Sequence, residues 1–71
     1  MILDTLIKNY LESIDNLTGD EYLLRAMSYA KTWIPPEKRD SIKIVSILSQ
    51  YTNREEISIK NCEQLCKEIE M

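Results

Sequence analysis

The feature that most restricts how this chain can fold is the lack of an evident covalent or metal crosslink. The chain contains no histidine, and its two cysteines, Cys62 and Cys66, lie four positions apart. On a helix their side chains point the same way, so a disulfide between them is strained. Two thiolates without further ligands do not complete a zinc site. We expect two buried thiols, no metal and no cofactor, with a redox or metal contact shared across a dimer as the alternative.

The length of the chain makes stability the next constraint. Its 71 residues correspond to one helical domain, residues 1–71, and a domain this small buries only about 60% of the surface of its unfolded chain. With 44% apolar residues and no crosslink, such a chain gains its stability from close packing or from self-association. The composition therefore predicts a dense core and suits a homodimer.

The first half of the sequence carries two segments with the spacing of amphipathic helices. Residues 3–17 place their apolar side chains on one side of a helix. Residues 19–33 follow, and this helix should stop before Pro35, because a proline disfavours helical geometry in the residue that precedes it. Thr18 and Glu21 have the spacing of a capping box, which predicts that Thr18 caps the second helix.

The second half is less regular, but its spacing also favours helices. Pro36 is expected in the first turn of a third helix. Residues 41–51 are rich in β-branched side chains at helical spacing, and a strand is the alternative. Asn53 and Glu56 predict the start of a fourth helix, with a kink and a second cap at Ser58 left open. The predicted fold is all-α, a small bundle of three to four short helices joined by tight turns.

One flank of the second helix carries the strongest candidates for partner binding. It combines aromatic side chains with an arginine, the residue types that dominate binding hot spots, and core packing is the competing interpretation. Basic residues around the proline pair could orient an acidic partner, or could simply be solvated. The predicted partner-binding residues are Tyr22, Arg25, Tyr29, Trp33, Lys31, Lys38, Arg39 and Lys43.

Charge is distributed unevenly along the chain. The formal net charge is −3, but residues 22–54 hold six Lys or Arg and only two acids, so the middle is basic. Such asymmetry suits an acidic partner, and the third and fourth helices have roughly the lengths of a helix-turn-helix. Glu63 and Glu68 on the would-be recognition helix disfavour DNA, because they would face a polyanion. Binding to nucleic acid therefore stays the second hypothesis.

No motif of the sequence points to catalysis or to a membrane. Histidine is absent, and neither a Gly-rich phosphate loop nor a nucleophile elbow occurs, so we expect that the chain is not an enzyme. The longest concentrated apolar stretch is far shorter than the roughly 18 residues of a membrane span, and Asp4 near the start argues against a signal peptide. We expect a cytoplasmic protein.

These observations favour one class of function. The sequence predicts a helical protein-protein interaction module, such as a regulator, an inhibitor or an immunity-type protein, whose partner protein it does not identify. A structural subunit of a larger assembly is a further alternative. Ten isoleucines beside two alanines and one glycine suggest an AT-rich coding genome, such as that of a low-GC bacterium or a phage.

Overall fold

The computed structural model describes residues 2–69, with only the backbone of Ile69, and these residues form four α-helices and one short 3-10 turn. Within that range there is no strand, which confirms the all-α prediction and the helical interpretation of residues 41–48. The same range contains no helix that is long and apolar enough to cross a bilayer. The elements are α1 (Ile2–Ser13), α2 (Gly19–Lys31), η1 (Pro36–Lys38), α3 (Ser41–Leu48) and α4 (Ile59–Ile69).

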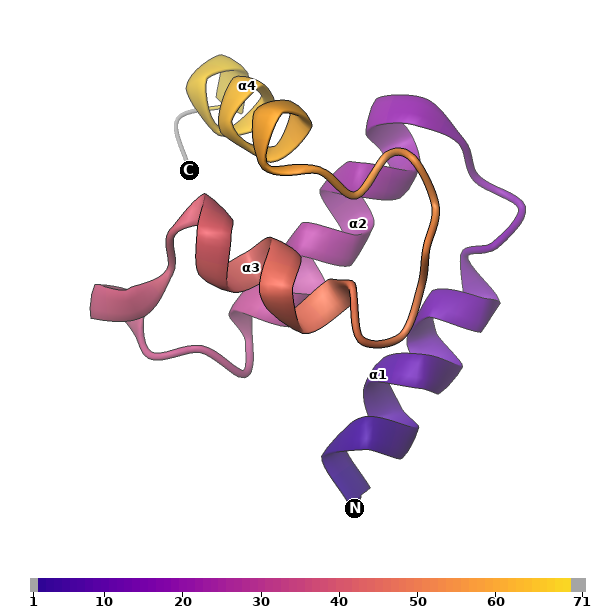
Figure 1. The fold of residues 1–71 in the computed structure, drawn as a ribbon. Helices are drawn as coiled ribbons and strands as arrows, with labels where there is room; N and C mark the ends of the chain where they lie inside the picture. Colours follow the sequence, from indigo (N-terminus) through magenta and orange to yellow (C-terminus); the bar gives the residue numbers. More distant parts are fainter. Residues whose placement is uncertain (1, 70–71) are drawn as a thin grey trace.

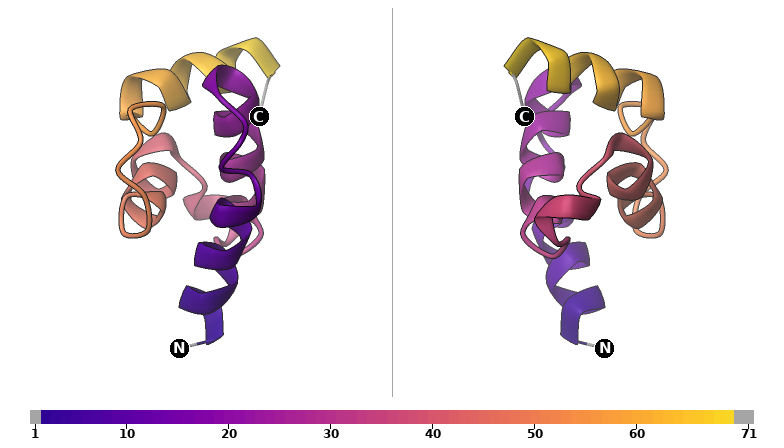
Figure 2. Two further views of the ribbon diagram at one scale, coloured as in Figure 1. Left: turned by 90° about the vertical axis from the view of Figure 1, so that its right-hand side faces the viewer. Right: turned by 90° about the vertical axis from the view of Figure 1, so that its left-hand side faces the viewer.

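Helix α2 lies at the centre of the molecule and contacts α1, α3 and α4 (Figure 1). α1 rises from the N-terminus, and α2 returns antiparallel to it, so the two helices overlap only over part of their lengths (Figures 1 and 2). The first turns of α1 consequently project beyond the rest of the molecule (Figure 2). In the part of the chain described, the hydroxyl of Tyr51 donates a hydrogen bond to the carboxylate of Asp4 in this projecting helix.

The core is built from one face of each helix and is centred on α2. Its central side chains are fully enclosed, and Tyr22 is the largest of them. The wide apolar arc of α2 follows from its position, because three neighbouring helices cover it. The buried residues are Ile7, Leu11, Ile14, Tyr22, Leu23, Ala26, Met27, Ala30, Ile34, Ile44, Leu48, Cys62 and Leu65.

Two predicted helix boundaries, the end of the first helix and the start of the third, shift in the structure. α1 ends at Ser13 and not at residue 17, because the chain tightens into turns in which Asp15 and Leu17 donate to the carbonyls three positions earlier. Pro36 starts the separate turn η1 and not a third α-helix. α3 begins only after Asp40, whose carboxylate accepts a hydrogen bond of 2.8 Å from the amide of Lys43.

The predicted start of the fourth helix near Asn53 is wrong. Residues 49–58 form a long connection that passes beside the end of α1 and the start of α2 before it reaches α4 (Figure 1). α4 begins at Ile59, and the Ser58 hydroxyl accepts a hydrogen bond of 3.1 Å from the amide of Asn61, so the cap at Ser58 is confirmed. The prediction that tight turns join all the helices therefore fails between α3 and α4.

Candidate functional site

The predicted binding flank of α2 is divided by the fold, because Tyr22 belongs to the core. Its side chain is 1% exposed, and the guanidinium carbon of Arg54 lies 3.8 Å from the centre of its ring. The assignment of Tyr22 to a partner-binding surface is therefore wrong. Arg25 and Trp33 are exposed, and Tyr29 is half-buried, so these three remain accessible.

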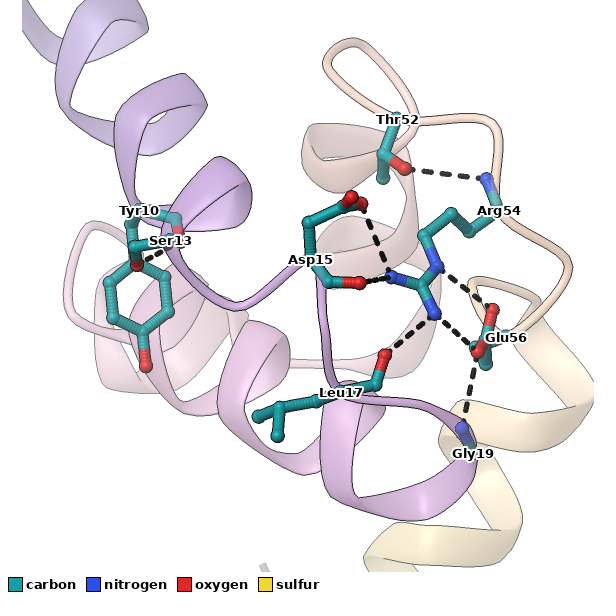
Figure 3. Close-up of polar contacts among 8 residues, drawn as sticks. All are labelled: Tyr10, Ser13, Asp15, Leu17, Gly19, Thr52, Arg54 and Glu56. Atoms are coloured by element: carbon teal, nitrogen blue, oxygen red, sulfur yellow. Dashed lines mark hydrogen bonds and ion pairs between the residues drawn. The ribbon is translucent and has the colours of Figure 1, made fainter.

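Arg54 is the most extensively bonded side chain in the described part of the molecule, and no local sequence pattern predicts this role. One terminal nitrogen donates to the carbonyl of Asp15 at 3.0 Å, and the other donates to the carbonyl of Leu17 at 2.8 Å (Figure 3). The Glu56 carboxylate accepts two further bonds from Arg54, of 3.3 and 2.9 Å. We call Arg54 and Glu56 with these partners the Arg54 clamp. It ties residues 49–58 to the turn between α1 and α2.

Glu56 also provides the cap of α2 that the sequence assigned to Thr18. Thr18 occupies the N-cap position, but its side chain makes no capping hydrogen bond, so the predicted capping box is wrong. The Glu56 carboxylate instead accepts a bond of 3.1 Å from the amide of Gly19, which lies 37 positions earlier (Figure 3). Glu56 also does not start the fourth helix, because its carboxylate accepts a hydrogen bond at the start of α2.

The electrostatics of the clamp favour its charged form. The hydrogen bonds from Arg54 lower the pKa of Glu56, and the amide of Gly19 lowers it further. The same carboxylate raises the pKa of Arg54. Because its donors are committed to carbonyls and to Glu56, Arg54 fixes the fold and is not available as a ligand-binding cation.

The accessible aromatic residues form a row that joins α1 to α2. The rings of Tyr10 and Tyr29 are stacked, with centroids 4.1 Å apart and an angle of 6° between their planes. Tyr29 and Trp33 meet edge to face at 6.1 Å. Trp33 remains 40% exposed at the end of this row. Tyr10 was not among the predicted binding residues, because its spacing places it with the apolar side chains of the first helix.

Exposed apolar side chains precede Tyr10 on the same side of α1. On α1, Ile2 and Leu6 precede Tyr10 at intervals of one helical turn, and they are 81% and 40% exposed. The neighbouring hydroxyls bond to their own helices, Ser13 to the carbonyl of Tyr10 and Thr32 to that of Ser28. We call this surface the aromatic face; its residues are Ile2, Leu6, Asn9, Tyr10, Ser13, Arg25, Ser28, Tyr29, Thr32 and Trp33.

The predicted basic residues do not act as one group. Lys31 and Arg39 line a cavity of about 300 Å³ together with Pro36, Ile44 and Cys66, whereas Lys38 and Lys43 are exposed and do not line it. The Arg39 Nε donates to the carbonyls of Lys31 at 3.0 Å and Ile34 at 2.8 Å, which closes the end of α2.

The two thiols occupy different environments. Both cysteines are free, but only Cys62 is buried, and Cys66 is half-buried at the wall of the cavity. Burial raises the pKa of the Cys62 thiol. The prediction of two buried thiols therefore holds for Cys62 and fails for Cys66, because Cys66 lies at the edge of the α4 stripe.

The described residues offer no metal-binding group, and the chain has no match among known proteins. Among residues 2–69, the structure brings together no group of three Cys, Asp or Glu side chains that would hold a metal ion. Comparison of the chain with protein-family models, with curated proteins and with solved structures finds no match.

Proposed function

We propose that this chain is a protein-binding module that acts through the aromatic face. The observation that carries the proposal is the exposure of this row: Trp33 is 40% exposed at the end of the Tyr10–Tyr29–Trp33 contacts, and Leu6, one helical turn before Tyr10, is also 40% exposed. The interiors of protein interfaces are depleted in charge and enriched in aromatic residues and arginine. The aromatic face carries three aromatic side chains, Tyr10, Tyr29 and Trp33, together with Arg25.

The geometry of the face suits a helix of the partner protein. α1 and α2 run antiparallel and are held side by side by the stack of Tyr10 on Tyr29. Rows of side chains spaced by one helical turn, such as Ile2 and Leu6, pack against the rows of a third helix. The partner helix is therefore expected to present an apolar stripe, with one carboxylate at its edge facing Arg25.

This mode of action fits a small regulator or inhibitor that occupies a surface of its partner. Two exposed apolar side chains of the face, Ile2 and Leu6, belong to α1, whose first turns project beyond the rest of the molecule (Figure 2). Burial of apolar surface contributes about 25 cal/mol per Å², so the aromatic side chains are expected to dominate the affinity.

The proposal is tested by affinity capture, with variants that each replace one exposed apolar side chain by serine. Leu6→Ser and Trp33→Ser change the aromatic face, and Ile42→Ser changes an exposed apolar residue of α3 outside it. We expect the same bound protein with the wild-type chain and Ile42→Ser, and its loss with the other two variants. Capture that all three variants reduce equally, or that none reduces, would contradict the proposal.

The same variants show whether the partner is a second copy of the chain. Sedimentation of the purified protein over a concentration series measures self-association directly. A dimer that Leu6→Ser dissociates and Ile42→Ser does not would identify a second copy as the occupant of the aromatic face.

A further inference from the structure

We propose that the cavity between α2, η1, α3 and α4 binds a small molecule that carries a carboxylate or phosphate group on a short apolar stem. This site is separate from the aromatic face, because Lys31 points to the opposite side of α2 from Tyr29. The inference concerns a ligand and not a partner protein, so it does not depend on the proposed function.

The size of the cavity is the first argument. Its volume is about 300 Å³, against about 70 and 100 Å³ for the two other cavities described. Ligand sites of proteins begin at roughly 300 Å³, so this cavity accommodates a compact molecule. Its walls come from α2, η1, α3 and α4, with the core residue Ile44 at its base and the more exposed Lys31, Pro36, Arg39 and Cys66 around it.

The charge of the lining is the second argument. The cavity is lined by two cations, Lys31 and Arg39, and by no carboxylate. The ion pairs of the described residues involve Arg54 with Asp15 and Glu56, and neither lining cation has such a partner. Asp40 follows Arg39 in the chain, but its carboxylate accepts from the amide of Lys43 and does not line the cavity. The charged groups of the lining are therefore both positive.

Arg39 is held in an orientation that suits an oxyanion. Its Nε bonds to the carbonyls of Lys31 and Ile34 fix the guanidinium plane. The four N–H groups on its two terminal nitrogens have no acceptor among residues 2–69, and they match the fork geometry of carboxylate and phosphate. The C-terminal end of α2 lies at this cavity and carries the equivalent of about half a negative charge, which would repel an anion. The two full positive charges of Lys31 and Arg39 exceed it.

The remaining wall of the cavity is apolar and defines the rest of the ligand. Pro36, Ile44 and Cys66 contribute carbon and sulfur surface, and Ile44 is anchored in the core. A ligand with a few methylene groups behind its oxyanion therefore buries them here. Each buried methylene contributes about 0.8 kcal/mol, so affinity should rise with the length of the stem.

The probes for the experiment are acetate, butyrate and inorganic phosphate, titrated into ¹⁵N-labelled protein at constant ionic strength, with chloride as the control. We expect saturable shifts at the amides of Lys31, Arg39, Ile44 and Cys66. Butyrate should bind about tenfold more tightly than acetate because of its two additional methylenes. The relative affinity of phosphate and butyrate assigns the ligand to phosphate esters or to carboxylates.

Three variants separate this site from general attraction of anions. Lys31→Ala and Arg39→Ala should each weaken binding about tenfold, because each removes charge-assisted hydrogen bonds. Lys38→Ala removes a neighbouring exposed charge and should leave binding unchanged. Lys31→Ala retains the backbone carbonyls that hold Arg39, so it remains informative if Arg39→Ala loosens α2. Shifts that do not saturate, that spread equally to Lys60 and Lys67, or that survive both cavity variants would overturn the proposal.

Discussion

Arg54 lies with its guanidinium carbon 3.8 Å from the centre of the Tyr22 ring, and the same group bonds to the main chain at Asp15 and Leu17. A cation so placed is attracted by the face of the aromatic ring, and its N–H groups also pair with two carbonyls of the turn between α1 and α2. The largest core side chain and the turn between α1 and α2 are therefore held by one residue of the long connection.

The first prediction concerns this residue. Arg54→Ala should lower the midpoint of thermal unfolding by on the order of 10 °C, because it removes the bonds to two carbonyls and leaves Glu56 without its cation. The midpoint of Arg54→Lys should lie between those of Arg54→Ala and the wild type, since an ammonium group cannot form the several bonds of the planar guanidinium. Circular dichroism melts measure both effects. A midpoint for Arg54→Ala equal to that of the wild type would show that the clamp contributes no stability.

The second prediction concerns pH. The hydrogen bonds from Arg54 lower the pKa of Glu56 in the folded protein below its ordinary value of 4.5. The Glu56 carboxylate therefore stabilises the fold above pH 4.5, and this stabilisation is lost as the pH falls through the pKa of the folded state. Glu56→Gln should therefore destabilise the protein at pH 7, and the difference from the wild type should shrink below about pH 4.5. Chemical unfolding at several pH values measures it. Glu55 is exposed and provides the control: Glu55→Gln should leave the dependence of the unfolding free energy on pH unchanged.

A third prediction compares Tyr22 and Trp33, two of the three aromatic residues of the predicted flank. Tyr22→Ala should cost about 3 to 5 kcal/mol of folding free energy, because a fully buried ring leaves a cavity. Trp33→Ala should leave the protein folded, since its side chain is partly solvated at the end of the aromatic row. Urea unfolding of the two variants makes the comparison. Equal destabilisation would place Trp33 in the core and remove it from the aromatic face.

The fourth prediction concerns thiol reactivity. Under native conditions Cys66 should react with a disulfide reagent such as Ellman's reagent well before Cys62, which is buried and has a raised pKa. Cys66→Ser and Cys62→Ser assign each phase of the reaction. Both thiols should react at one rate once the protein is unfolded in denaturant. Fast reaction of Cys62 in the folded protein would contradict its placement in the core.

Much of the fold could be predicted because it depends on local spacing. The helical nature of residues 41–48, the end of α2 before Pro35 and the cap at Ser58 all follow from side chains within a few positions of one another. The apolar residues of the second helix cover an arc wider than one neighbour requires, a pattern that fits either a central helix or one partly committed to another chain. In the structure three helices contact α2.

Several of the errors have a common physical origin, which is contact between residues distant in the sequence. Glu56 has the spacing of a helix-starting residue relative to Asn53, but its carboxylate bonds to Arg54 and Gly19. Tyr22 and Trp33 share a flank of α2, yet Arg54 covers only one of them. The pairing of Tyr10 with Tyr29 likewise depends on how α1 and α2 meet, which no local pattern specifies.

The cap of α2 has a consequence for the order in which the protein folds. Its acceptor, Glu56, lies 37 positions beyond the amide of Gly19, and the bonds from Arg54 to Asp15 span 39 positions. Closing a loop of this length costs conformational entropy before any contact is gained, and contacts between distant residues slow folding. An early α1–α2 hairpin therefore lacks the partner that fixes its turn. Its final docking awaits the arrival of residues 54–56, which makes this closure the expected rate-limiting event of refolding.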